Sequence, residues 1–141
     1  MAEQGPRFRR RGGEDLGGSL EYGLRKQILL AEYRRGLKML DELCDAHPDL
    51  LRAARHKVGR AAETNCPICE VEQLWLVTYV FGKGLPPGGT CPGTKGELQK
   101  LLRRPDEVQC FEVEVCSACA WHHLVRRYPA GGIVPRKRTA R

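Results

Sequence analysis

Two pairs of cysteines in this 141-residue sequence have the spacing of metal ligands. The segments Cys66–Cys69 and Cys116–Cys119 are both C-x-x-C motifs. Two thiolates at this spacing can hold one metal ion from a single tight turn, and two such turns complete the tetrahedral shell of a structural zinc site. The sequence therefore predicts a Zn²⁺ site. Its predicted ligands are Cys66, Cys69, Cys116 and Cys119.

Other interpretations of the two motifs remain open. Iron can bind the same four thiolates, and unliganded buried cysteines or a redox C-x-x-C are further alternatives. A redox motif normally places a reactive thiol at a helix N-terminus, and neither pair opens a predicted helix. Zinc knuckles often carry glycine after the second cysteine, where this chain has Glu70 and Ala120. The 46 residues between the pairs also exceed the usual gap of roughly 15–20.

The remaining cysteines are expected to be non-ligands. Cys44 and His47 form a C-x-x-H pair, which we interpret as a small buried helix residue and a polar break before Pro48. Cys91 lies in a Gly/Pro-rich loop, and Cys110 lies on the strand that leads to the second pair.

Residues 61–128 are predicted to be a zinc-ribbon-like domain. Apolar and alternating patterns indicate strands at 75–81, 108–115 and 121–128. Residues 82–105 are expected to be an inserted loop and short helix, because Thr94 and Glu97 match a capping box. His122 and His123 would face opposite sides of the last strand, so that at most one approaches the metal, as a ligand or a hydrogen-bond partner of one.

Residues 19–60 are predicted to be helical. Ser19 is a plausible N-cap, Gly36 follows two arginines as a helix stop, and Pro48 suits the first turn of a third helix. We expect these short helices to form a small bundle or hairpin. The fold class predicted for the whole chain is therefore α+β, with N-terminal helices followed by an antiparallel sheet that carries a helical insertion.

The net charge of +7 is concentrated at the two ends of the chain. Residues 1–13 carry a net +3 and residues 126–141 a net +6, whereas residues 14–125 carry −2. Residues 1–18 and 129–141 are expected to be disordered basic tails, which can bind phosphate backbones by counterion release. The candidate nucleic-acid contacts are Arg9, Arg10, Arg11, Arg126, Arg127, Arg136, Lys137 and Arg138.

Several classes of protein are excluded by composition. No apolar run approaches the roughly 18 residues of a membrane-spanning helix, and the N-terminus lacks the apolar core of a secretory signal. Seven cysteines are too few for a disulfide scaffold of this length. These features predict a cytoplasmic protein with neither a membrane partner nor an evident small-molecule substrate.

The cysteine motifs also resemble those of a known family. The segments around Cys66 and Cys116, together with 44–48 and 51–54, are similar to small actinobacterial proteins annotated only as a domain of unknown function. The resemblance covers roughly residues 20–128. It implies an actinobacterial cytosolic protein with a zinc-ribbon-like half, and it implies no activity.

Two functions are compatible with this sequence. The first is a non-enzymatic zinc protein that binds RNA or DNA, or docks on a nucleic-acid machine such as RNA polymerase or the ribosome, through its basic tails. The alternative is a metal- or redox-responsive regulator acting through protein–protein contacts. An enzyme is disfavoured, because four thiolates fill the coordination shell that a catalytic zinc must leave open.

Overall fold

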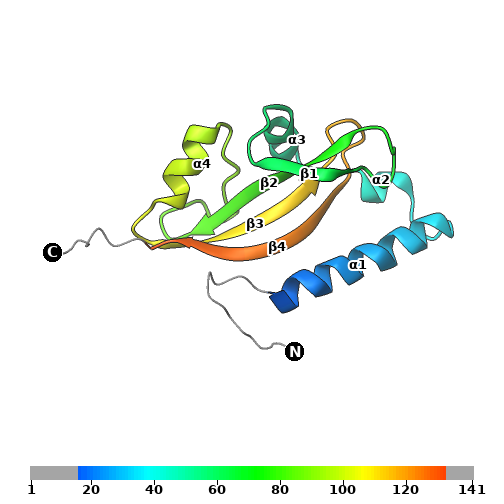
Figure 1. Cartoon of the computed structure of the whole chain (residues 1–141), viewed down its shortest axis with the longest axis horizontal. Helices are drawn as coiled ribbons and strands as arrows, with labels where there is room; N and C mark the ends of the chain where they lie inside the picture. The colour runs from blue at the N-terminus through cyan, green and yellow to red at the C-terminus, as the bar shows by residue number, and fades with distance from the viewer. Residues whose placement is uncertain (1–15, 133–141) are drawn as a thin grey trace.

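The computed structural model describes residues 16–132, in which four helices surround one antiparallel sheet with the strand order β1-β2-β3-β4 (Figure 1). The predicted α+β class, with a helix inserted between two strands, is confirmed. The helices are α1 (Leu16–Arg34), α2 (Leu40–Leu43), α3 (Pro48–Arg55) and α4 (Lys95–Leu102). The strands are β1 (Arg60–Asn65), β2 (Gln73–Gly82), β3 (Glu107–Val115) and β4 (His122–Gly131).

Regular structure extends into both predicted tails. Helix α1 begins at Leu16, so Ser19 lies inside the helix and is not its N-cap. Strand β4 runs to Gly131, three residues into the predicted segment 129–141. The other tail residues, 1–15 and 133–141, lie outside the described part of the chain. Within the described part, no helix is both long and apolar enough to cross a membrane.

The predicted helix boundaries at Gly36 and Pro48 are confirmed, and each has a local cause. The amide of Gly36 bonds the carbonyl of Tyr33, and the amide of Leu37 bonds that of Glu32, which is the Schellman pattern. Gly36 takes the positive φ of +78° that this stop requires. At the start of α3, His47 is the N-cap, and its Nδ1 accepts a hydrogen bond from the backbone N–H of Asp49.

The predicted bundle of N-terminal helices is wrong, because α1 and α3 pack on opposite faces of the sheet (Figure 1). Leu30 of α1 belongs to a buried cluster with Leu74, whereas Ala53 of α3 is buried with Val77. Leu74 and Val77 lie an odd number of residues apart on β2, and side chains alternate between the faces of a strand. Helices α1 and α3 therefore pack on the sheet and not on each other, whereas α1 and α2 meet in the buried cluster of Leu30 and Leu43.

The sheet is a meander, in which each strand pairs with the next one in the sequence, and it consists of two hairpins joined edge to edge. Strands β1 and β2 form the first hairpin, β3 and β4 form the second, and β2 pairs with β3 along its length from Trp75↔Val115 to Gly82↔Val108. Both hairpin loops lie at the same end of the sheet, beside α2, while α4 lies at the other end (Figure 1). Each loop carries one C-x-x-C motif, so the sheet brings together two motifs that are far apart in sequence.

The long gap between the motifs is occupied by the predicted insertion. Helix α4 follows the loop after β2, and Thr94 caps it by accepting a hydrogen bond from the N–H of Glu97 at 3.1 Å. The Glu97 carboxylate accepts from the N–H of Gly93, one residue before the position that a capping box predicts. The insertion therefore lengthens the connection between the hairpins without separating the motifs.

Glu112 is buried in the middle of the sheet between two arginines. Its side chain is 4 % exposed, Arg60 of β1 donates two hydrogen bonds to it at 3.0 and 3.1 Å, and Arg126 of β4 donates one at 2.8 Å. Burial alone would raise the pKa of Glu112, but the hydrogen bonds from Arg60 and Arg126 more than offset it and lower that pKa. The ionised carboxylate on β3 thus links β1 and β4 through its hydrogen bonds to the two arginines.

We expect Glu112→Gln to lower the free energy of unfolding by about 2–3 kcal/mol at pH 7, because it leaves two arginines beside a neutral amide. A lowered folded-state pKa stabilises above the unfolded value of about 4.3 and loses that stabilisation as pH falls through the folded pKa. The difference between variant and wild type should therefore shrink below about pH 4. Urea unfolding at pH 7 and below about pH 4 measures this difference in stability. Replacement of the exposed Glu107 by glutamine is the control. A deficit independent of pH would contradict it.

Candidate metal centre

The four cysteines of the two motifs form one cluster, in which the Sγ atoms of Cys66, Cys69, Cys116 and Cys119 lie within 4.8 Å of one another. The Sγ atoms of Cys66 and Cys119 are 3.6 Å apart, and those of Cys69 and Cys116 are 3.7 Å apart. A tetrahedral ion with metal–sulfur bonds of about 2.3 Å sets sulfurs roughly 3.8 Å apart. The donor set and its spacing are therefore consistent with a bound metal ion.

Both cysteine turns adopt a knuckle geometry although neither has the expected glycine. Glu70 and Ala120 follow the second cysteine of each motif, with φ of +62° and +73°. Their backbone N–H groups bond the carbonyl oxygens of Cys66 and Cys116, each at 3.0 Å. The structure thus uses the left-handed backbone that glycine would favour and imposes it on two residues with a Cβ.

Backbone amides also point at the sulfurs. The N–H of Ile68 lies 3.4 Å from the Sγ of Cys66, and the N–H of Cys119 lies 3.4 Å from the Sγ of Cys116. Amides in a tight turn that converge on one atom favour negative charge there. The two turns are therefore arranged to stabilise thiolates, the form in which cysteine binds metals.

The cluster is enclosed by apolar side chains on its inner side. Cys66 and Cys116 are buried, and Cys69 and Cys119 are half-buried. They pack with one residue from each surrounding element. These neighbours are Leu30 of α1, Leu43 of α2, Leu74 of β2 and Trp121 after the second turn. The cysteine cluster is consequently the centre of a hydrophobic core that joins the helices to the two hairpins.

The cysteines differ in how readily they ionise without a metal. Burial raises the pKa of the Cys66 and Cys119 thiols, whereas backbone N–H groups of Glu72 and Val71 lower that of Cys69 to about 7. Removing the protons from two buried thiols costs free energy unless a cation balances the charge. The site is therefore consistent with a metal cation that balances the charge of the four thiolates.

Trp121 couples this centre to a second buried glutamate. Its backbone carbonyl accepts from the N–H of Cys116 at 2.9 Å, and its indole N–H donates to Glu114 at 3.0 Å. Glu114 is 7 % exposed in its side chain and also pairs with Lys26 of α1 at 2.7 Å. A continuous chain of contacts thus links α1, the sheet and the second cysteine turn.

Cys44 lies beside the cluster, which the sequence analysis did not anticipate. Its thiol donates to the Sγ of Cys119 at 3.7 Å. The two residues after it also bind the second turn, because Asp45 contacts His122 at 2.8 Å and the N–H of Ala46 bonds the carbonyl of Ala120 at 3.0 Å. The C-x-x-H spacing of residues 44–47 was the available signal, but His47 turned out to be a helix cap.

The other two cysteines lie in separate parts of the core. Cys91 packs against the α3 side of the sheet and contacts the carbonyl of Asp49, while Cys110 is buried with Val80 and Val108. Burial raises the pKa of both thiols to about 11. Neither belongs to the four-cysteine cluster, in agreement with the sequence expectation.

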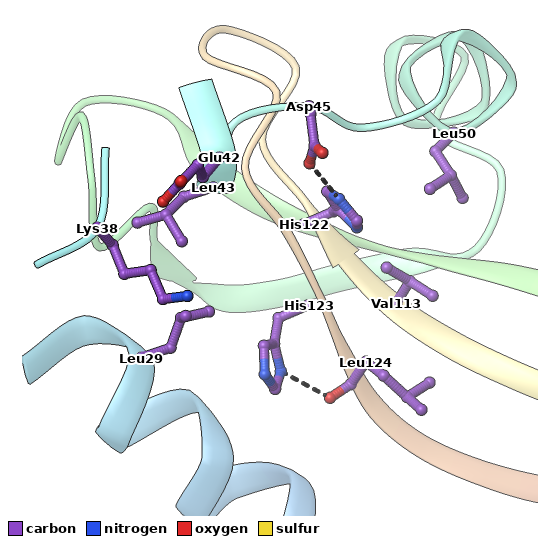
Figure 2. Close-up of a pocket in the computed structure, with 10 residues that line it drawn as sticks. All are labelled: Leu29, Lys38, Glu42, Leu43, Asp45, Leu50, Val113, His122, His123 and Leu124. Atoms are coloured by element: carbon purple, nitrogen blue, oxygen red, sulfur yellow. Dashed lines mark hydrogen bonds and ion pairs between the residues drawn. The ribbon is translucent and has the colours of Figure 1, made fainter. Parts of the chain in front are cut away.

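A cavity of about 470 Å³ adjoins the second cysteine turn, between α1, the segment around Asp45 and strand β4 (Figure 2). His122 and His123 point to opposite sides of β4, as predicted. His122 faces Asp45, and the Nδ1–H of His123 donates to the carbonyl of Leu124. Burial lowers the pKa of His123, so its ring is neutral at pH 7. No hydroxyl or thiol is among the residues described as lining this cavity, and His122 and Asp45 form a hydrogen-bonded pair at 2.8 Å within it.

The candidate nucleic-acid contacts fall into two groups. Six of them lie outside the described residues: Arg9, Arg10, Arg11, Arg136, Lys137 and Arg138. Arg126 donates to Glu112, and its guanidinium lies 4.4 Å from the ring centre of Tyr128. Arg127 is exposed on β4, opposite Phe111 of β3.

Comparison with known proteins gives relatives but no activity. Residues 17–141 match a Family of unknown function (DUF5318). The chain is 43 % identical over 116 residues to the Uncharacterized protein Rv0049 of Mycobacterium tuberculosis and to the Uncharacterized protein Mb0050 of Mycobacterium bovis. The aligned part covers 82 % of this chain and 84 % of each relative. No solved structure matches the chain significantly.

Proposed function

Because the chain belongs to the DUF5318 family of unknown function, we propose its role from the geometry of the cysteine cluster. We propose that the protein is a non-enzymatic zinc protein whose metal holds the two hairpins and the N-terminal helices together. The observation that carries this proposal is the cluster of four Sγ atoms from two knuckle turns. Four thiolates in a closed tetrahedral shell are typical of structural zinc and leave no open position for a substrate.

Metal content tests this proposal directly. We expect native mass spectrometry of the purified full chain to show one zinc ion per protein, and Cys66→Ser to lose it. Cys91→Ser, which changes a cysteine outside the cluster, should keep the zinc. If the purified protein is instead red and contains iron, the metal held by these four cysteines is iron and not zinc. A metal-free wild type purified under reducing conditions would refute the proposal.

The basic ends of the chain support a role in binding nucleic acid, either directly or on RNA polymerase or the ribosome. Residues 126–141 carry six positive charges and no acidic residue, whereas residues 14–125 have a net charge of −2. The described residues 16–132, which include Arg126 and Arg127 of β4, carry a net charge of +2, and four thiolates with a zinc dication would bring this part to neutral. A phosphate backbone would therefore be attracted mainly to the ends, since residues 133–141 carry four positive charges and no acidic residue.

We expect removal of residues 1–15 and 133–141 to abolish binding to a labelled RNA or duplex DNA oligonucleotide, measured by fluorescence anisotropy. The full chain should lose affinity as salt rises, with a logarithmic slope of about −0.7 to −0.9 for each phosphate contact. The cuts leave every described residue in place, so circular dichroism of the truncated chain controls for folding. A truncated chain that binds as tightly as the full chain would contradict the proposal.

A metal- or redox-responsive regulatory role is the second candidate function. The thiol of Cys44 beside the cluster is the observation that favours it.

A further inference from the structure

The cysteine cluster contains five thiols in two chemical roles. Cys44 is as near to Cys119, at 3.7 Å, as the predicted metal ligands are to one another. Cys44 is nevertheless outside the set of four sulfurs that lie mutually within 4.8 Å. A tetrahedral ion takes four ligands, so a bound metal leaves Cys44 as a free thiol in contact with a ligand.

The position of Cys44 is fixed from both sides. Cys44 caps the C-terminus of α2, where its backbone N–H bonds the carbonyl of Leu40, the first residue of that helix. On its other side, Asp45 and Ala46 are bound to His122 and Ala120, which flank the second cysteine turn. The Cys44 thiol is therefore held against Cys119 by the fold and does not reach it by chance rotation of an exposed side chain.

We propose that Cys44 is the resolving cysteine of an oxidation site at the metal centre, with a hydroperoxide as the oxidant. The proposal rests on the zinc centre proposed above. The Cys119 thiolate attacks the peroxide, which breaks the O–O bond, gives a sulfenic acid at Cys119 and releases the other oxygen as hydroxide or alkoxide. The Cys44 thiol then displaces that hydroxyl group, forming a Cys44–Cys119 disulfide and water.

The geometry favours Cys44 over the other nearby thiols for the second step. Cys66 is equally close to Cys119, but its sulfur is a metal ligand and is fully buried. Cys44 is half-buried and lies outside the four-ligand set, and Cys119 is half-buried as well, so this pair is easier for a peroxide to reach than Cys66 is. Closing the sulfurs from 3.7 Å to a bond of about 2.05 Å requires a movement of about 1.7 Å, within reach of side-chain rotation.

The disulfide would remove one of the four metal ligands and tie the α2–α3 segment to the second cysteine turn. Zinc held by three thiolates in an opened shell binds more weakly, so oxidation should release it. A disulfide can be reduced by thiols, whereas a sulfenic acid without a resolving partner proceeds to irreversible sulfinic acid. Cys44 would therefore make metal release reversible.

The test uses the full, zinc-loaded chain, hydrogen peroxide and a chromophoric zinc chelator. Native mass spectrometry first establishes one zinc ion per chain, and its absence would refute the zinc proposal separately. In the wild type we expect peroxide to release the zinc and peptide mass spectrometry to find a Cys44–Cys119 disulfide. After dithiothreitol, the chain should bind zinc again.

The variant Cys44→Ser should hold zinc before oxidation but lose most of its capacity to bind zinc again after dithiothreitol, with Cys119 found as sulfinic acid. The matched variant Cys91→Ser, changed at a cysteine outside the cluster, should behave like the wild type. Full recovery of zinc binding by Cys44→Ser would overturn the proposal. So would a wild-type disulfide between two of the four cluster cysteines, or zinc that stays bound in peroxide.

Discussion

Removing the metal, or replacing Cys66 by serine, will separate the N-terminal helices from the sheet and lower the free energy of unfolding by at least about 4 kcal/mol. Zinc contributes about 10–16 kcal/mol of apparent binding free energy in finger peptides that have almost no other core. Here the sheet has its own apolar clusters around Val77 and Val80, so strand pairing should survive in part. The loss should therefore be confined to the metal end.

The reason is the position of the cysteines within the core. Cys66 and Cys116 are both buried in the same cluster as Leu30 of α1 and Leu43 of α2. Without a metal, four thiols meet in an apolar pocket, and no bond joins their sulfurs to one another. The helices that pack on this cluster then lose the surface that orders them.

Thermal unfolding by circular dichroism, with and without a chelator, measures the loss. Hydrogen exchange locates it, and we expect faster exchange in α1 and both cysteine turns but not in the central pairing of β2 with β3. Cys91→Ser is the matched control, because it removes a thiol from the core without touching the cluster. A chelator that leaves the melting temperature and the exchange of α1 unchanged would sink this prediction.

Local patterns were sufficient to predict the four-cysteine cluster and most of the sheet. A C-x-x-C motif encodes its own turn, and the alternation in 108–115 encodes a strand with two distinct faces. The sequence also predicted the cap at Thr94, because a hydroxyl three residues before a glutamate satisfies the first amides of a helix locally. These features depend on residues that are close in sequence.

Strand β1 was missed because its signal is not local. The segment Arg60–Asn65 has no alternating apolar residues, contains Glu63 with a φ of +64°, and changes register against β2. It forms a strand because the first cysteine turn reverses the chain and so places β1 antiparallel to β2, along its edge. The hairpin, and not the propensity of these residues, determines its structure.

The buried glutamates show a second limit of local reasoning. Cys110, Glu112 and Glu114 share one face of β3, and this mostly polar face is more buried than the apolar face of Phe111 and Val113. Partners from distant elements make this burial possible: Arg60 for Glu112, and Lys26 of α1 for Glu114. Because no pattern within β3 reveals these partners, the sequence could not show that α1 covers one face while α3 covers the other.

We expect Trp121→Ala to lower the free energy of unfolding by about 3–5 kcal/mol, the usual range when a buried tryptophan is replaced by alanine. Trp121 is 0 % exposed, packs in the cluster of the metal cysteines and donates to the buried carboxylate of Glu114. The substitution therefore removes apolar contacts beside the cysteine cluster and also leaves Glu114 with Lys26 as its remaining described side-chain partner. Because the total stability of a domain is only roughly 5–15 kcal/mol, this loss is a large share of it, and the melting temperature should fall.

The variant Trp121→Phe separates the two effects, since it keeps most of the apolar volume and removes only the N–H donor. We expect this variant to lower the free energy of unfolding by about 1–3 kcal/mol, the penalty for a buried acceptor that loses its hydrogen-bond partner. Because Trp121 accepts from Cys116 only through its backbone, both variants should still bind zinc when folded. Urea unfolding gives the two free energies and native mass spectrometry the zinc content. Equal losses for Ala and Phe would mean that the hydrogen bond to Glu114, and not packing against the metal cysteines, is what Trp121 contributes.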